Sequence, residues 1–133
     1  MIRIGLVIFI AAMLAGCGGA TGYQDRNWTG GLLVTQLNEN LYSVHFSGNG
    51  FTHQARAYDF ALLKASEITI QKGYQYFDII DSTTVSEGRG PGFMEGYGDA
   101  RIQFLIKEKM GEASVDADIT RRQLREKYAS EFR

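Results

Sequence analysis

Three titratable side chains could support acid–base or metal chemistry: Glu67, His45 and His53. Glu67 is expected between apolar neighbours in a helix, and a buried carboxyl group is a common general acid or base; a capping or salt-bridging role is the structural alternative. The two histidines are the only ones in the chain, and two ligands without a third histidine, cysteine or suitably spaced carboxylate make a poor metal site. The sequence has no Ser/His/Asp set, nucleophile elbow or kinase signature. We therefore predict no catalytic residue, no metal, no cofactor and no enzymatic activity.

A glycine-rich stretch over residues 85–98 holds five glycines and the only proline. Its Gly88–Gly92 segment is similar to phosphate-binding loops in composition alone, because it has no Gly-Lys-Ser/Thr ending and does not join a strand to a helix. We predict a loop, in which Phe93, Met94 and Tyr97 form a candidate surface for a partner or ligand.

The only cysteine, Cys17, follows a positive charge at Arg3, an apolar run over residues 4–13 and the small residues Ala15 and Gly16. The run is too short for a transmembrane helix, which needs about 20 residues, and is typical of a cleaved export signal. The tetrapeptide Leu14-Ala15-Gly16-Cys17 resembles the lipobox of bacterial lipoproteins, which implies a diacylglyceryl group on the thiol, cleavage before the cysteine and acylation of the new amine. We predict a cleaved signal over residues 1–16, a lipidated cysteine with a flexible tether over 17–29, and one domain over 30–133.

The lipobox also predicts where the protein is found. A lipid-anchored, palmitate-bearing protein belongs to the cell envelope, and Gly18 stands where an aspartate commonly retains such lipoproteins at the inner membrane. We therefore expect the outer membrane, with the domain facing the periplasm. The glycosylation sequon Asn27-Trp28-Thr29 is interpreted as chance in a protein of bacterial type.

Charge and length exclude other classes of function. The net charge is −1 and becomes −2 without Arg3, which argues against nucleic acid as a partner. The remaining chain has the usual size of a single domain. Because its one cysteine carries lipid, packing rather than a disulfide must stabilise the fold.

The elements that would position these residues can be read from hydrophobic periodicity. Residues 30–37 and 41–47 predict a hairpin with its turn at 38–40, since side chains alternate in the second segment. A helix is expected over 53–72, capped by Thr52 and ended by Gly73. Its predicted buried stripe comprises Ala55, Tyr58, Leu62, Ala65 and Thr69, widened by Ala61 and Ile68.

The second half predicts two more strands and a helix. Residues 74–84 are rich in aromatic and β-branched residues, and 101–107 alternate strictly, so the two should pair across the 85–98 loop. A final helix begins near Asp116 or Asp118, either of which can cap it. The predicted fold is α+β: a small antiparallel or mixed sheet of about four strands, with one long helix packed on it and a C-terminal helix.

Several short motifs carry a resemblance to a known family. They are Gly30-Gly31, the G-N-x-x-T turn at 48–52, the A-x-E-x-T helix at 65–69, the G-x-x-Y-F strand start at 73–77, Lys-Met-Gly-Glu at 109–112 and Asp116-Ala117. This set resembles a family of small, uncharacterised proteobacterial lipoproteins, in which a second alanine usually occupies the position of Ser66. The resemblance implies an envelope lipoprotein and implies no activity.

Two hypotheses for function follow. The first is a non-enzymatic interaction or structural protein, anchored in the membrane by lipid and contacting an envelope protein partner. The alternative is a periplasmic small-ligand binding module, in which Tyr58, Tyr76 and Tyr97 line a pocket between the long helix and the glycine-rich loop.

Overall fold

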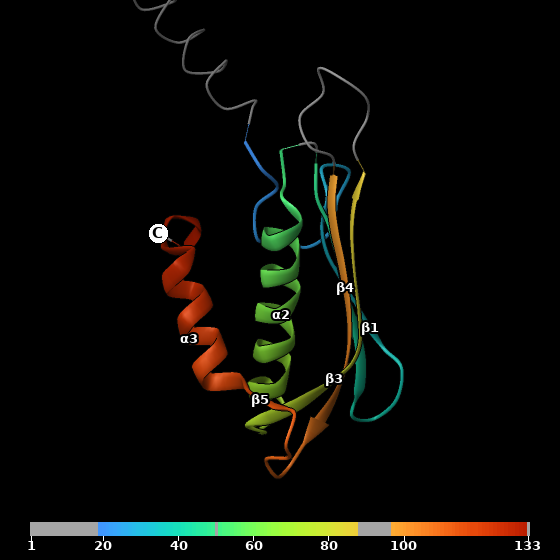
Figure 1. The fold of residues 1–133 in the computed structure, drawn as a ribbon, viewed down its shortest axis with the longest axis vertical. Coiled ribbons are helices and arrows are strands. Elements are labelled where there is room, and N and C mark those ends of the chain that lie inside the picture. The colour runs from blue at the N-terminus through green and yellow to red at the C-terminus, as the bar shows by residue number, and fades with distance from the viewer. Residues whose placement is uncertain (1–18, 50, 88–96, 133) are drawn as a thin grey trace, which may run out of the picture.

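The protein folds as an antiparallel sheet with two helices stacked over one of its faces (Figure 1). The computed structural model describes residues 19–49, 51–87 and 97–132. Its strands are β1 (Gly31–Gln36), β2 (Leu41–Ser47), β3 (Tyr76–Glu87), β4 (Tyr97–Lys107) and β5 (Ser114–Asp116), and its helices are α2 (Gln54–Gln71), α3 (Ala117–Lys127) and a 3-10 turn, η1 (Ala129–Phe132). The predicted α+β class is confirmed, and the short β5 is the element that periodicity did not reveal.

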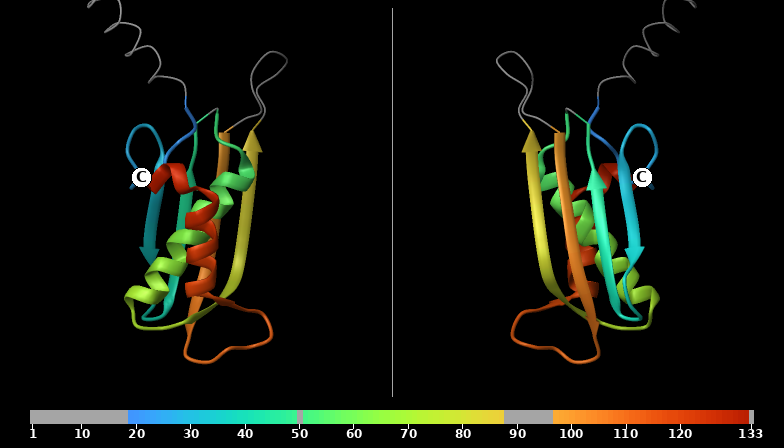
Figure 2. Two further views of the ribbon diagram at one scale, coloured as in Figure 1. Left: turned by 90° about the vertical axis from the view of Figure 1, so that its left-hand side faces the viewer. Right: turned by 90° about the vertical axis from the view of Figure 1, so that its right-hand side faces the viewer.

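Strand order in the sheet is β1-β2-β4-β3-β5, with every neighbouring pair antiparallel. Both predicted hairpins form: β1 pairs with β2, and β3 pairs with β4. The second hairpin joins the first through β4 beside β2, so the longest ladders lie at the centre of the sheet. Helix α2 covers one sheet face and α3 lies outside α2, while no helix within the described residues covers the other face (Figure 2).

Alternation in the central strands sets which side chains reach the core. Tyr42, Val44 and Phe46 of β2 and Ile102, Phe104 and Ile106 of β4 are all buried under α2, as predicted. On β3 Phe77 is fully buried, whereas Ile80 is 55% exposed. The register shifts between Ile79 and Asp81, so Ile80 is the extra residue of a β-bulge and its side chain leaves the alternation.

Helix α2 begins and ends close to the predicted residues, but its first cap is different. His53 is the N-cap and makes no side-chain capping bond; the predicted cap, Thr52, is fully buried and bonds elsewhere. At the other end Gly73 has φ +85, its N–H donates to the carbonyl of Ile70, and that of Tyr74 donates to the carbonyl of Thr69. These two bonds form a Schellman motif, which explains why glycine ends the helix.

The buried surface of α2 is broader than one stripe. Ala61, Ala65, Ile68 and Thr69 are buried as predicted, Tyr58 and Leu62 are half-buried, and Ala55 is exposed. Phe60, outside the predicted stripe, packs edge-on against Tyr23, Phe46 and Tyr128. It is fully buried because α2 is covered on two sides, by the sheet and by α3.

Candidate functional site

The structure describes only some of the predicted site residues. Cys17, Phe93 and Met94 lie outside the described residues. Tyr97 is the first residue of β4, where the structure gives its backbone register opposite Glu87. Tyr76 pairs with Lys107 at the other end of β4. An 11-residue strand is about 33 Å long at 3.3 Å per residue, so Tyr76 and Tyr97 do not line one pocket.

Tyr58 faces an open groove beside the first turns of α2. The groove has a volume of about 560 Å³ and is lined by His53, Gln54, Ala55, Tyr58, Asp59, Thr84 and Lys127. Its two charged groups bind each other, since Lys127 Nζ lies 2.8 Å from Asp59 Oδ2. Gln54 Nε2 donates to Thr84 Oγ1 across the same groove. The polar lining therefore ties α2 to α3 and β3.

Glu67 joins three parts of the chain. Its Oε2 accepts a hydrogen bond from the hydroxyl of Tyr23 at 2.9 Å, and its Oε1 lies 2.9 Å from Arg125 on α3. Burial, followed by the charge of Glu67 and this hydrogen bond, raises the pKa of Tyr23. The carboxylate thus has the salt-bridging role that was the structural alternative to catalysis.

A second polar junction lies about two to three helical turns earlier on α2, at Asp59 and Arg56. Asp59 Oδ2 accepts from the hydroxyl of Tyr128 at 2.6 Å. Burial, and then this bond to Asp59, raises the pKa of Tyr128. Arg56 binds Glu131 and the carbonyl of Thr21. The N-terminal segment and the C-terminal helix are thereby fastened to the same face of α2.

The two histidines belong to different environments. His45 Nε2 on β2 lies 3.3 Å from Asp99 Oδ2 on β4, on the sheet face opposite α2. Burial lowers the pKa of His45, and the nearby charge of Arg26 adds to this effect, so its ring is neutral at neutral pH. His53 is exposed at the start of α2. Among the described residues no group of three His, Cys, Asp or Glu side chains is placed to hold a metal.

The segment before β1, expected as a tether up to residue 29, is packed against the domain where the structure describes it. The N–H of Thr21 donates to Thr52 Oγ1 at 3.0 Å, and Thr52 Oγ1 donates to Asn49 Oδ1 at 2.9 Å. The ring of Tyr23 packs edge-on against Phe60, with centroids 5.3 Å apart. The flexible tether expected from the glycines is therefore corrected: these contacts fix the chain from Thr21 onward, and they also explain why Thr52 does not cap α2.

The sequence reasoning also missed the turn that connects this segment to β1. The N–H of Asn27 donates to the carbonyl of Gly30 at 3.0 Å, and the N–H of Gly30 donates back to Asn27 at 3.1 Å. Asn27 Oδ1 accepts the N–H of Thr29 at 2.8 Å, and Gln24 Nε2 donates to Thr29 Oγ1 at 3.0 Å. Trp28 stands at the tip of this tight turn and is 96% exposed. The Asn27-Trp28-Thr29 sequence, which matches a glycosylation sequon, is a sequence signal for an Asx turn.

Comparison with known proteins identified no relative of this chain. No protein-family model, no curated protein and no solved structure matches the chain. Within residues 19–49, 51–87 and 97–132, no helix is both long and apolar enough to cross a bilayer. Function must therefore be inferred from the residues themselves.

Proposed function

We propose that this protein is a bacterial envelope lipoprotein, anchored through acylated Cys17, whose domain acts by non-enzymatic contact with another envelope component. The Leu14-Ala15-Gly16-Cys17 sequence behind an apolar run is the observation that carries the proposal. Burial of acyl chains is worth about 0.8 kcal/mol per CH₂, and more than one chain gives stable anchoring. The new amine and the thiol of Cys17 together offer places for three chains.

The roles of the domain's polar residues support an interaction protein. Glu67 and Asp59 accept from tyrosine hydroxyls and bind cationic side chains of α3. His45 is paired with Asp99. These groups have structural partners, so they supply no free acid or base in a cleft. A ligand pocket built from Tyr58, Tyr76 and Tyr97 is not favoured, because β4 separates two of its three members.

The anchor is tested by expressing the full chain and its Cys17→Ser variant in bacteria fed a palmitate analogue. We expect label in the parent, a mass consistent with cleavage before Cys17, and recovery in the outer-membrane fraction of a sucrose gradient. Cys17→Ser should be unlabelled and unprocessed. Gly18→Asp is the matched control for sorting: it should keep the label and move to the inner-membrane fraction. Labelling of Cys17→Ser, or an unlabelled parent that is released as a soluble protein, would contradict the proposal.

A further inference from the structure

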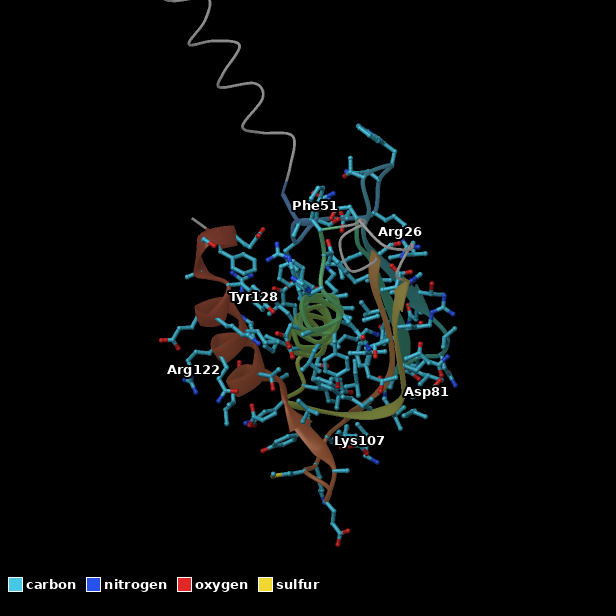
Figure 3. The ribbon with its side chains drawn as sticks, turned by 45° about the horizontal axis from the view of Figure 1, so that its top comes forward. Arg26, Phe51, Asp81, Lys107, Arg122 and Tyr128 are labelled. Carbon is cyan, nitrogen blue, oxygen red and sulfur yellow. The ribbon has the colours of Figure 1, made fainter. Side chains whose placement is uncertain are left out.

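The end of the domain that carries Gly19 also presents exposed aromatic side chains. Gly19, Trp28 and Asn49 line one open hollow of about 720 Å³, so the tip of the Asn27–Gly30 turn lies beside the start of the described chain. Phe51, which is 47% exposed, follows Asn49 at this end. Figure 3 labels Phe51 and Arg26 at this end of the domain.

We propose that Trp28, with Phe51 exposed at the same end of the domain, inserts into the headgroup region of the bilayer that holds Cys17, and so fixes the orientation of the domain on the membrane. The inference rests on the proposed acylation of Cys17. The surface that Trp28 meets is a lipid surface, because after the proposed cleavage only Cys17 and Gly18 precede Gly19, and two residues span at most about 7 Å. The end of the domain that carries Gly19 must then lie at the bilayer.

The attachment of Gly19 prevents the domain from swinging away. Asn49 Nδ2 donates to the carbonyl of Gly19 at 2.8 Å, and the N–H of Asn49 donates to Thr21 Oγ1 at 2.8 Å. The side chain of Arg56 donates to the carbonyl of Thr21 at 3.1 Å. The chain is thus held on the domain almost as soon as it leaves the proposed lipid.

The Trp28 turn is built to hold an indole in the solvent. Its backbone bonds, its Asx turn and the Gln24 bond fix the turn without any contact that would bury the ring. Gly30 adopts φ +111, and a Cβ there would lie 2.3 Å from the carbonyl oxygen of Ser47; the turn therefore sits tightly on the end of β2. Indole rings favour the membrane–water interface, where an apolar body and a polar N–H are both satisfied.

The turn that carries Trp28 has few charged side chains. Residues 19–30 contain only Asp25 and Arg26, and Asp99 lies near the end of β2, where it accepts hydrogen bonds from the Ser47 hydroxyl and the Gly48 N–H. At the opposite end, the last residue of β4 is Lys107, and the chain between β4 and β5 contains Glu108, Lys109 and Glu112. The turn that carries Trp28 can therefore approach headgroups with fewer charges to desolvate than the segment from Lys107 to Glu112.

Trp28 is the only tryptophan, so fluorescence reports on it alone. The mature acylated protein is reconstituted in phosphatidylethanolamine–phosphatidylglycerol vesicles, with or without lipids brominated near the headgroup. We expect a blue-shifted emission, marked quenching by the brominated lipid and several-fold weaker quenching by aqueous iodide than in urea. Emission typical of indole in water, fully quenched by iodide in protein that co-floats with the vesicles, would overturn the inference.

The matched control moves the probe to the far end of the domain. Met110 is 68% exposed in the connection between β4 and β5, so the double variant Trp28→Phe and Met110→Trp should be quenched by iodide and not by brominated lipid. Equal quenching of both proteins by brominated lipid would also overturn the orientation. Flotation itself tests the anchor: absence of flotation refutes acylation of Cys17, whereas flotation with a water-exposed Trp28 refutes only the insertion.

Discussion

Phe60→Ala should destabilise the domain more than any other single truncation on α2, because this ring joins three parts of the fold. Its centroid lies 5.3 Å from that of Tyr23, 5.3 Å from that of Phe46 and 5.0 Å from that of Tyr128, each in an edge-to-face arrangement. The guanidinium of Arg56 lies 4.5 Å from the same centroid. The ring is fully buried.

The expected loss follows from burial and from the cavity left behind. Truncation of a buried phenylalanine to alanine costs about 3–5 kcal/mol, and each edge-to-face pair contributes about 0.5–1.5 kcal/mol beyond area burial. We expect a value near the upper end of the first range. Leu62→Ala is the control on the same helix: Leu62 is half-buried at the border of the core, so its truncation should cost about 1–2 kcal/mol.

Urea unfolding of the mature protein in mild detergent measures both variants. Far-ultraviolet circular dichroism is the appropriate signal, because Trp28 is exposed in the folded domain and its emission would change little on unfolding. With a slope of about 1–3 kcal/mol per molar urea, Phe60→Ala should lower the midpoint by roughly 2 M. If Leu62→Ala costs as much as Phe60→Ala, or if Phe60→Ala unfolds like the parent, the assignment of Phe60 as the centre of the core is refuted.

Two further predictions concern the polar contacts of the N-terminal segment and of α3. Thr52→Val keeps the volume of a fully buried residue but removes the acceptor of the Thr21 N–H and the donor to Asn49. The free energy of unfolding, measured in urea, should fall by about 2–4 kcal/mol. Thr35→Val, on the exposed side of β1, is the control and should change it little; equal effects of the two substitutions would contradict the hydrogen-bond assignment. The raised pKa values of Tyr23 and Tyr128 mean that the folded state keeps phenolic protons that the unfolded state releases near pH 10. The free energy of unfolding should therefore be unaffected by these tyrosines below pH 10 and should fall above it, by up to about 1.4 kcal/mol per pH unit for each tyrosine. Tyr23→Phe should flatten this pH dependence, and an unchanged slope would show that the fold does not raise the pKa of Tyr23.

The parts of the fold that sequence could predict are those set by local spacing. Apolar and polar side chains alternate along β2 and β4 with a period of two residues. This alternation identifies the buried face of each strand without any knowledge of its neighbours. Gly73 ends α2 through a left-handed residue that glycine adopts at little cost. The bulge at Ile80 could not be predicted, because one additional residue alters the register and leaves the composition of the strand unchanged.

The role of a residue could not be predicted from sequence where its side chain suits two different structural positions. Thr52 has the side chain of a helix cap, but Thr21, which is 31 positions earlier, supplies a buried N–H that competes for its oxygen. Phe60 lies outside a stripe drawn for a helix with one buried side, and it becomes central only because α3 covers the second side. Gly22 and its neighbours suggest flexibility, yet Tyr23 docks between α2 and η1 through Phe60 and Phe132.

The contacts of the N-terminal segment connect the anchor to the surface that a partner can reach. If Cys17 is acylated and Trp28 lies at the headgroups, the strands run away from the bilayer, since β1 begins and β2 ends beside the Asn27–Gly30 turn. The charged connection between β4 and β5 is then held about 33 Å from the membrane, the length of an 11-residue strand. The uncovered sheet face, with His45, Asp99 and Arg101 on it, stands upright on the membrane. A partner embedded in the same membrane would therefore meet this face from the side, whereas a soluble periplasmic partner could also approach the Lys107–Glu112 end.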